Sequence, residues 1–286
     1  MKPLVSVIIP TYNRKNFLEE ALESVFSQDY RPLEVIVVDD GSTDDTPKLA
    51  TRYPIKYIRG PRRGPAAARN RGISVSHGEF VAFLDSDDLW RPEKIRRQVE
   101  FFEKKPGAVA VQTEEIWLRD GKRVNPRKRH QKPDGFFFQR ALELCLVSPS
   151  AVMLRRRVFA EIGLFDESFP VCEDYELWLR LSARYPVFLI REPLVIKRGG
   201  HEDQLSRTPG LDWFRLQAIA KIYKDPHLSP TMRLLCLREA RQKAAIYRQG
   251  ALKRGKLWMA FAVERMLEEL FTHPGLPSQA QLPEKL

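Results

Sequence analysis

Short apolar runs alternate with amphipathic stretches along the first hundred residues. The apolar runs have the length and the β-branched content of buried strands, and they lie at residues 5–10, 33–39, 55–59 and 80–84. The amphipathic stretches have the spacing of helices, at residues 16–27, 43–51, 66–76 and 92–104. This alternation is typical of a parallel sheet with helices on both faces. The pattern therefore predicts an α/β fold with a Rossmann-like, mostly parallel sheet.

The rest of the chain is less regular at first and then helical. Residues 108–115 and 149–154 predict strands, residues 173–185 a helix, and residues 187–190 and 194–196 two short strands. Residues 119–132 hold seven Lys or Arg among Gly, Pro and Asn, which predicts a basic loop. From residue 211 to 271 the pattern is helical, with Pro226 and Pro230 as separators. The Pro-, Gln- and Ser-rich residues after 272 predict a loose tail.

Polar residues follow directly after three of the predicted strands, at residues 11–14, 39–42 and 85–88. In open α/β sheets, ligands bind outside the carboxyl ends of the strands. Asp, Gly and Ser are also ordinary turn residues, and turn formation alone is the alternative interpretation. Turns explain one such cluster better than three at equivalent strand ends, so we expect one shared crevice.

Two carboxylates spaced i, i+2 follow the strand that ends near residue 84. Asp85 and Asp87 are hard oxygen ligands, which suit Mg²⁺ or Mn²⁺ bound together with the phosphates of a nucleotide. Asp residues also cap helices, and Asp88, ahead of Pro92 in a first helical turn, has that alternative role. Asn16 and Thr43 likewise predict N-caps for the helices that they begin.

Two further side chains in the first hundred residues suit a nucleotide. Asp40 is a hydrogen-bond acceptor matched to the N–H edge of a nucleobase. Arg69, in a helix that opens with small residues, is placed to reach a phosphate, and a surface ion pair is the equal alternative.

Composition and charge limit the classes of protein. The chain has 286 residues, 43% of them hydrophobic and 30% charged, as in soluble globular proteins, and its net charge of +11 predicts anionic partners. Cys145, Cys172 and Cys236 form no CxxC pair, which argues against a zinc site and a disulfide framework and predicts a reducing cytoplasm. No signal peptide and no membrane-spanning run is recognisable, so we expect a cytoplasmic protein that at most contacts the membrane's inner face.

Four strings in the first hundred residues carry a family resemblance. They read VIIPTYNR at residues 7–14, VDDGSTD at 38–44, ARNRG at 68–72 and FLDSDD at 83–88. Together they resemble the signature of the family 2 glycosyltransferases, which have the GT-A fold. The resemblance implies a catalytic domain at 1–207, with a nucleotide-sugar-binding half at 1–105 and an acceptor-binding half at 106–207. Residues 208–286 would form a helical C-terminal extension.

The resemblance also implies roles for single residues. Glu173 and Asp174 are similar to the family's E-D motif, in which the Asp is the general base; an N-cap for the helix at 173–185 is the alternative for Asp174. Asp87 would bind the metal directly, and Asp85 the ribose or the metal shell. The nucleotide contacts implied are Pro10, Tyr12, Arg14, Asp40, Arg69, Asp85 and Ser86. His201, in a Gly-Gly-His stretch expected to close over the diphosphate, is a further candidate metal or phosphate contact.

The predicted function is an inverting transfer of a sugar from a nucleoside diphosphate sugar, with uridine the expected base, to an acceptor hydroxyl. The reaction would need Mn²⁺ or Mg²⁺ and would serve polysaccharide, glycolipid or other glycoconjugate synthesis, with a carbohydrate or lipid-linked acceptor. A nucleotidyltransferase lacks support because no glycine-rich phosphate loop follows the first strand, and a catalytically inactive nucleotide-sugar-binding module is the remaining alternative. A nucleic-acid partner is not expected, since the basic residues are not interleaved with stacking aromatics. No partner protein is indicated.

The last helical segment has an apolar face. It consists of Leu257, Trp258, Phe261, Leu267, Leu270 and Phe271. Docking on the catalytic domain and attachment to a membrane surface are both open interpretations of this face.

Overall fold

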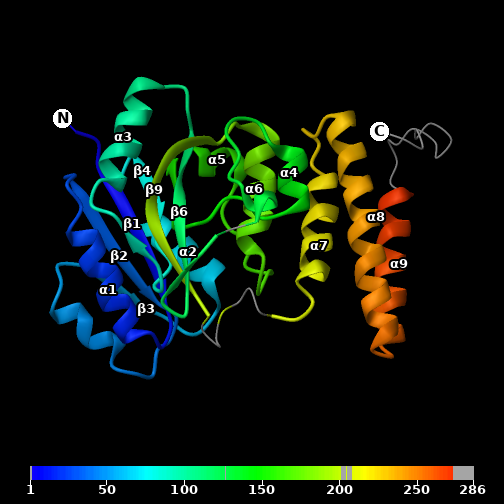
Figure 1. Cartoon of the computed structure of the whole chain (residues 1–286), viewed down its shortest axis with the longest axis horizontal. Helices are drawn as coiled ribbons and strands as arrows, with labels where there is room; N and C mark the ends of the chain where they lie inside the picture. Colours follow the sequence, from blue (N-terminus) through cyan, green and yellow to red (C-terminus); the bar gives the residue numbers. More distant parts are fainter. Residues whose placement is uncertain (1, 126, 201–203, 205–207, 273–286) are drawn as a thin grey trace. The chain divides into compact units, whose positions relative to one another are not determined.

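The computed structural model describes residues 2–125, 127–200, 204 and 208–272 (Figure 1). The chain divides into two compact units, Met1–Thr208 and Pro209–Leu286. The expected loose tail after residue 272 lies outside the described residues. No described helix is both long and apolar enough to cross a membrane.

The first unit is built from strands and helices that alternate along the chain. Its first half contains β1 (Val5–Thr11), α1 (Lys15–Phe26), β2 (Leu33–Asp39), the short 3-10 helix η1 (Thr46–Thr51), β3 (Lys56–Arg59), α2 (Pro65–Val75), β4 (Phe80–Phe83), β5 (Leu89–Trp90) and α3 (Lys94–Lys104). Its second half contains β6 (Ala110–Arg119), β7 (Lys122–Val124), the 3-10 turn η2 (Lys128–His130), α4 (Phe138–Glu143), β8 (Val152–Arg155), α5 (Val158–Ile162), α6 (Glu173–Arg184) and β9 (Phe188–Gly199).

The described strands form one sheet in the order β3-β2-β1-β4-β8-β6-β9-β5, with β7 paired to β6. The strands β3, β2, β1 and β4 are parallel to one another. Beyond them the sheet is mixed, because β8 runs antiparallel to both β4 and β6, while β9 is parallel to β6. The α/β class is confirmed. The parallel pairing expected from the strand–helix alternation applies to β3, β2, β1 and β4, which include the three strands that carry the predicted polar clusters.

Two predictions for the middle of the chain were wrong in detail. The two short strands expected at 187–190 and 194–196 are one strand, β9, whose pairing with β6 shifts register around Thr113 and Glu114. Such an irregularity accommodates extra residues without ending the strand. Part of the expected basic loop at 119–132 is β7, which forms a hairpin with β6.

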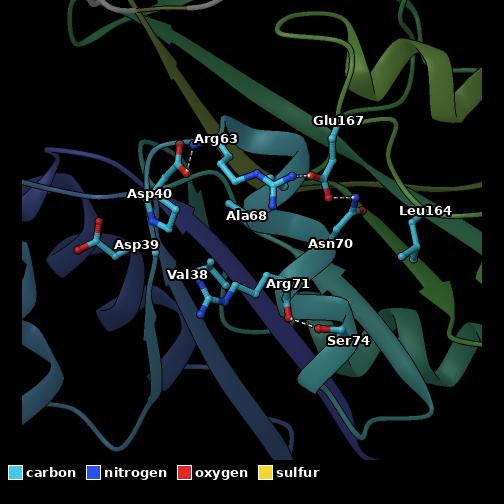
Figure 2. A pocket seen from close by; sticks show the side chains of 13 residues that line it. Val38, Asp39, Asp40, Arg63, Ala68, Asn70, Arg71, Ser74, Leu164 and Glu167 are labelled. Carbon is cyan, nitrogen blue, oxygen red and sulfur yellow. Dashed lines mark hydrogen bonds and ion pairs between the residues drawn. The ribbon is translucent and has the colours of Figure 1, made fainter.

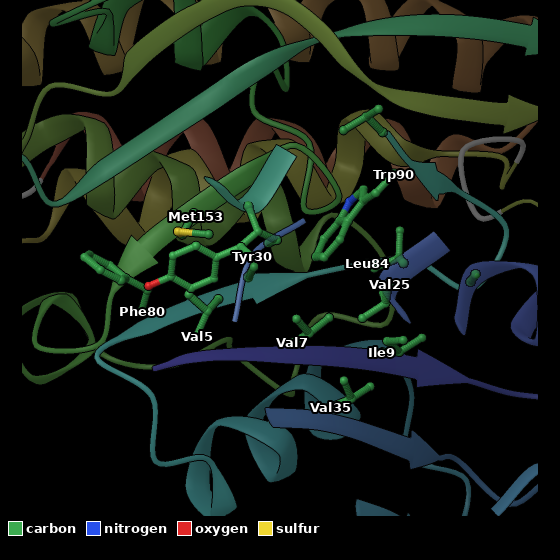
Figure 3. Close-up of a cluster of buried hydrophobic side chains, with 14 of the residues drawn as sticks. Val5, Val7, Ile9, Val25, Tyr30, Val35, Phe80, Leu84, Trp90 and Met153 are labelled. Carbon is green, nitrogen blue, oxygen red and sulfur yellow. The ribbon is translucent and has the colours of Figure 1, made fainter. Parts of the chain in front are cut away.

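The hydrophobic core lies against the parallel strands (Figure 3). Val5, Val7 and Ile9 of β1 are fully buried on one side, in one cluster with Leu22 and Val25 of α1. On the other side α2 approaches β1 so closely that a Cβ atom at Gly72 would lie 2.4 Å from a methyl group of Ile8. Because β1 is buried on both faces, it has no alternating polar positions to expose. The close approach of α2 brings Arg69 and Asn70 next to the strand ends.

The predicted N-caps at Asn16 and Thr43 were wrong. Helix α1 begins at Lys15 with Arg14 at its N-cap, and η1 begins at Thr46 after Asp45. The reason is a contact between the two loops: the Asn13 side-chain oxygen accepts the backbone N–H of Thr43 at 2.7 Å. The loops after β1 and β2 therefore bind one another instead of capping their helices, which aligns the two strand ends.

The second unit consists of α7 (Leu211–Tyr223), α8 (Pro230–Lys253) and α9 (Leu257–Phe271). Ser229 caps α8 by accepting the backbone N–H of Met232 at 3.2 Å, with Pro230 at the first helical position. The break between α8 and α9 was not predicted. It is a Schellman turn, in which the Lys256 N–H bonds to the Ala251 carbonyl at 2.9 Å and Gly255 adopts a φ of 66°.

Candidate active site

Residues that follow three different strands meet at one edge of the sheet. Arg14, after β1, forms an ion pair with Asp87, after β4, at 2.9 Å. The backbone N–H of Asp40, after β2, bonds to the Thr11 carbonyl at 2.9 Å. The crevice expected from the three polar clusters therefore has a structural basis in direct contacts between them.

Arg69 connects the two halves of this unit. From α2 its guanidinium donates to Asp85 Oδ1 at 2.8 Å and to Glu173 Oε1 at 2.7 Å, and the side chain is buried. Burial lowers the pKa of Arg69, but the two carboxylates outweigh burial and hold the pKa above its ordinary value. The surface ion pair considered from the sequence is therefore wrong: this is a buried, charge-assisted bridge between the Asp85–Asp88 turn and α6.

Glu173 has an unusual environment for a carboxylate. Burial raises its pKa to about 7, with Arg69 opposing the rise and Asp174 adding to it. The Arg69 contact is the partner that makes burial of this charge tolerable, since an unpaired buried carboxylate is strongly disfavoured. Glu173 thus positions the turn that carries Asp85.

Ser150 and Arg198 hold the Asp85–Asp88 turn by hydrogen bonds. The Ser150 hydroxyl accepts the Asp85 N–H at 3.1 Å and donates to Asp88 Oδ2 at 2.7 Å. The backbone N–H of Arg198 donates to Asp88 Oδ1 at 3.0 Å, and its guanidinium donates to the Asp87 carbonyl. Asp88 is therefore not a helix cap, and α3 begins at Lys94 after a Glu93 N-cap. Its carboxylate instead fixes the conformation of the turn.

Asp174 occupies the first turn of α6, at the second helical position after the Cys172 N-cap, so it is not the N-cap that the alternative interpretation required. One carboxylate oxygen accepts the N–H of Tyr175 at 2.7 Å, and the other accepts the Cys145 thiol at 3.4 Å. Burial raises the pKa of the Cys145 thiol well above its ordinary value, and Asp174 adds to the rise, so the thiol stays protonated and donates. The positive end of the α6 dipole also favours negative charge at this position.

Lys197, on β9, supplies a half-buried cation close to these acids. Burial lowers its pKa, but nearby carboxylates outweigh that effect and hold it above the ordinary value; these are Glu115, Asp88, Asp85 and Asp174. Its Nζ lies 3.3 Å from the Ser148 hydroxyl. Glu115 in turn forms an ion pair with Lys132 at 3.2 Å, and although burial raises the Glu115 pKa, Lys132 and Lys197 lower it to about 2. The site is therefore a network in which fixed cations compensate clustered carboxylates.

Asp40 and Tyr12 are two of the residues expected to contact the nucleotide. The Asp40 carboxylate accepts the backbone N–H groups of Arg63 at 2.7 Å and of Gly64 at 2.8 Å, ahead of α2. Each carboxylate oxygen has two lone pairs, so these bonds leave acceptor capacity for a ligand. The Arg62 guanidinium lies over the Tyr12 ring, 4.2 Å from its centroid, and forms the other side of this region.

A cavity of about 380 Å³ opens beside α2, next to Asp40 (Figure 2). It is lined by Val38, Asp39, Asp40, Gly60, Pro61, Arg63, Ala67, Ala68, Asn70, Arg71, Ser74, Leu164 and Glu167. Arg63 and Asn70 both point toward Glu167, at 2.7 Å and 3.0 Å. These contacts tie the segment around Glu167, which precedes α6, to α2 and to the loop ahead of it, beside Asp40.

Comparisons with known proteins identify the family. The model of glycosyl transferase family 2 matches residues 6–163. An uncharacterised glycosyltransferase of Rickettsia typhi is 33% identical over 219 residues, which are 72% of this chain and 67% of that protein. The chain belongs to glycosyl transferase family 2. A second relative is the Escherichia coli enzyme WfaP, a UDP-Glc:alpha-D-GlcNAc-diphosphoundecaprenol beta-1,3-glucosyltransferase, at 32% identity over 190 residues, 63% of this chain and 71% of WfaP.

Solved structures confirm that this family 2 chain has the GT-A fold. TarS residues 1–349 of S. aureus, solved with UDP-GlcNAc, superposes with a TM-score of 0.66 at 18% identity, covering 93% of this chain and 91% of that one. The mannosyltransferase PcManGT of Pyrobaculum calidifontis, solved with GDP-Man and Mn²⁺, gives 0.59 at 20% identity, covering 94% and 86%. At these identities the likeness concerns the fold alone.

The donor atoms in this glycosyltransferase fit a divalent cation. Asp85 and Asp87 offer carboxylate oxygens, which Mg²⁺ and Mn²⁺ prefer. Arg69 binds one oxygen of Asp85, and Arg14 binds one oxygen of Asp87. Among the described residues, no group of three or more His, Cys, Asp and Glu is arranged to hold a metal ion. The two carboxylates therefore suit an ion whose coordination is completed by phosphate oxygens and water.

Three predicted site residues of this family 2 member remain to be placed, and the structure describes two of them. Pro10 lies at the end of β1, next to the shared edge, and Ser86 is buried within the turn. His201 lies outside the described residues. Sequence reasoning missed Cys145, Lys197, Ser150 and Arg198 as parts of the site. These residue types carry no motif, and each reaches the site from a distant part of the chain.

Proposed function

We propose that this family 2 glycosyltransferase is a metal-dependent, inverting enzyme that uses a nucleoside diphosphate sugar, with UDP-sugars the expected donors. The observation that carries the proposal is the Asp85–Arg69–Glu173 bridge. Through this bridge, Arg69 connects Asp85, one of the two carboxylates suited to bind a metal and a diphosphate, to Glu173. Glu173 precedes Asp174, the candidate general base. Donor and acceptor chemistry would thereby be held in one rigid arrangement.

In this proposal Asp174 takes the proton of the acceptor hydroxyl. The acceptor oxygen forms a bond to the anomeric carbon while the bond from that carbon to the diphosphate oxygen breaks, and the proton goes to the carboxylate. A divalent cation bound by Asp87 and Asp85 would neutralise the charge of the leaving diphosphate. Asp40, Tyr12, Pro10 and Arg14 would orient the nucleoside, and one displacement without a covalent intermediate would invert the anomeric centre.

A lipid-linked or other glycan acceptor suits this enzyme. WfaP, by its name, acts on a diphosphoundecaprenol-linked sugar, and it matches 63% of this chain. We therefore place the reaction in glycan synthesis, in the cytoplasm or at the inner face of the membrane.

Calorimetry with a panel of nucleoside diphosphates, with and without Mn²⁺, tests the donor site. We expect one diphosphate to bind only with metal, and Asp87→Ala to weaken that binding by at least about 50-fold, because the ion loses a direct ligand. Asp29→Ala removes an exposed carboxylate paired with Arg96 and is the matched control, expected to bind normally. Binding that ignores both Mn²⁺ and Asp87 would refute the metal-assisted mechanism.

The reaction products separate the alternative functions. A glycosyltransferase releases a nucleoside diphosphate from the donor, whereas a nucleotidyltransferase releases pyrophosphate from a nucleoside triphosphate. An inactive binding module would bind the donor with metal and release neither.

The hydrogen bond from Cys145 to Asp174 leads to a prediction for the candidate base. Because the Cys145 thiol donates to one oxygen of the Asp174 carboxylate and helps to orient it, Cys145→Ala should lower kcat by about 5-fold at neutral pH. The thiol also lies 3.5 Å from the Val147 carbonyl, so the effect should be modest. Diphosphate release from the donor is the assay.

The control for this prediction is Cys145→Ser, which retains a donor of similar size. It should keep kcat within about twofold of the wild type, given that a hydroxyl is a stronger donor than a thiol. Equal losses for the alanine and serine variants would show that Cys145 only fills space.

A further inference from the structure

The turn between α8 and α9 presents apolar side chains to solvent. Among the described residues, five of the eight exposed large hydrophobic side chains lie between residues 246 and 261. They are Ile246, Leu252, Leu257, Trp258 and Phe261. Trp258 and Phe261 have 71% and 67% of their surface exposed. Isolated exposed apolar residues are normal, but a group of this kind marks a surface that binds something.

The exposed apolar side chains are separate from the buried side chains that pack the helical unit. The predicted apolar face of α9 divides: Leu270 is buried, whereas Leu257, Trp258 and Phe261 at the start of the helix are exposed. Val263, which was not part of the predicted face, is also buried. The buried residues belong to the packing of the helical unit. The exposed ones follow directly after the Schellman turn at Gly255, so the chain carries them at the end of the α8–α9 hairpin.

The charge of the same segment is entirely positive. Residues 241–263 contain six Lys or Arg and no Asp or Glu. Lys243 pairs with Glu239 and Arg248 with Glu264, both from outside the segment. Lys253, Arg254 and Lys256 at the turn are exposed, next to the aromatic residues. Aromatic and aliphatic side chains flanked by exposed basic ones are typical of segments that lie in the interface of an anionic bilayer.

We propose that the α8–α9 turn, residues 252–261, is a docking surface for an anionic lipid membrane. Leu257, Trp258 and Phe261 enter the headgroup region, and Lys253, Arg254 and Lys256 contact lipid phosphates. The surface lies outside the catalytic unit, so this proposal does not depend on the donor, the metal or the general base. It would bring the enzyme to the leaflet that holds a lipid-linked acceptor.

Two other occupants fit the surface less well. In a symmetric dimer the same patch would face its copy, and the unpaired positive charges of the turn would repel one another. A nucleic acid would use the basic and aromatic side chains by stacking, but it would leave Leu252 and Leu257 without a partner. A bilayer can take up the aromatic and aliphatic side chains in its headgroup region and can bind the basic side chains through its lipid phosphates.

Sedimentation with vesicles of phosphatidylcholine, with and without phosphatidylglycerol, tests the proposal on the full chain. We expect binding only to the anionic vesicles. Lys253→Gln/Arg254→Gln/Lys256→Gln should weaken binding by about 100-fold, since each basic side chain near an anionic surface contributes about fivefold. Trp258→Ser/Phe261→Ser should weaken it by about 30-fold or more through the lost apolar burial. Salt should weaken wild-type binding.

Matched controls distinguish this surface from the protein's general charge. Lys122→Gln/Arg123→Gln/Lys128→Gln removes three exposed basic residues around β7, and Phe136→Ser removes the exposed Phe136 ring. Both should leave vesicle binding within about twofold. The tryptophan emission should shift to the blue on vesicle binding in the wild type and not in Trp258→Phe, which separates Trp258 from the other four tryptophans.

Three results would overturn the proposal. The first is no binding to anionic vesicles at low salt. The second is an equal loss of binding in the control triple variant. The third is a dimer in analytical ultracentrifugation that Trp258→Ser/Phe261→Ser converts to a monomer. Metal-dependent diphosphate binding should be unchanged in the α8–α9 variants, so failure here is distinguishable from failure of the proposed function.

Discussion

Replacing Asp174 by asparagine is expected to lower kcat by about 10³-fold, because general base catalysis typically contributes 10²- to 10⁴-fold. Asparagine has the size of aspartate and keeps an oxygen for the Tyr175 N–H, so α6 should be undisturbed. An amide has no basic oxygen that could take the proton of the acceptor. Diphosphate release from the donor measures kcat.

The donor-binding readout separates this loss from a folding defect. Metal-dependent diphosphate binding by Asp174→Asn should stay within about twofold of the wild type, because Asp87 and Asp85 are unchanged. Asp29→Asn, at an exposed ion pair with Arg96, is the control and should keep wild-type kcat. If Asp174→Asn retains more than about a tenth of wild-type kcat, Asp174 is not the general base.

Replacing Arg69 by methionine is expected to lower the free energy of unfolding by about 4 kcal/mol, since removal of one partner from a buried ion pair typically costs 3–5 kcal/mol. Methionine fills the volume but leaves Glu173 buried without its cation. Asp85 is 27% exposed and can be solvated, so most of the loss should come from Glu173. Urea unfolding followed by circular dichroism measures the effect.

The double variant Arg69→Met/Glu173→Gln isolates this cause. With the buried charge removed, it should recover about half of the lost stability. The gap between Arg69→Met and the wild type should also narrow at pH 5 relative to pH 8, because a Glu173 pKa of about 7 means the carboxyl is neutral at the lower pH. Arg97→Met, at an exposed ion pair with Glu192, should cost no more than about 1 kcal/mol. A similar small cost for Arg69→Met would show that the bridge is not important for folding.

Much of the fold of the first hundred residues could be predicted from local sequence. The four parallel strands begin and end within about one residue of their expected positions, since a buried strand is a continuous apolar run that ends at its first polar residues. The turn residues that follow, including Asp40, Asp85 and Asp87, were identified by their position after those strands. Helix starts were predicted less well: α1 begins at Lys15, before the predicted cap Asn16, and η1 begins at Thr46, after the predicted cap Thr43.

The supporting residues of the site could not be found in this way. Cys145 contacts a residue 29 positions away, Ser150 supports Asp88 from 62 positions away, and Arg198 reaches Asp88 across 110. Hydroxyl side chains and arginines occur throughout the chain, and the three cysteines form no motif, so the residue type does not mark these positions. Only a neighbouring carboxylate gives each of them a role.

The sequence by itself determined the α/β class, the family and the acidic residues at the strand ends, because each of these depends on residues close together in the chain. Tertiary structure alone decided how those acids are held. It placed Arg69 between Asp85 and Glu173, which is 104 residues from Arg69, and it set a thiol and a half-buried lysine near Asp174. It also left Trp258 and Phe261 exposed while burying Leu270 on the same helix. Burial and long-range ion pairs depend on which segments pack together, and no local pattern contains that information.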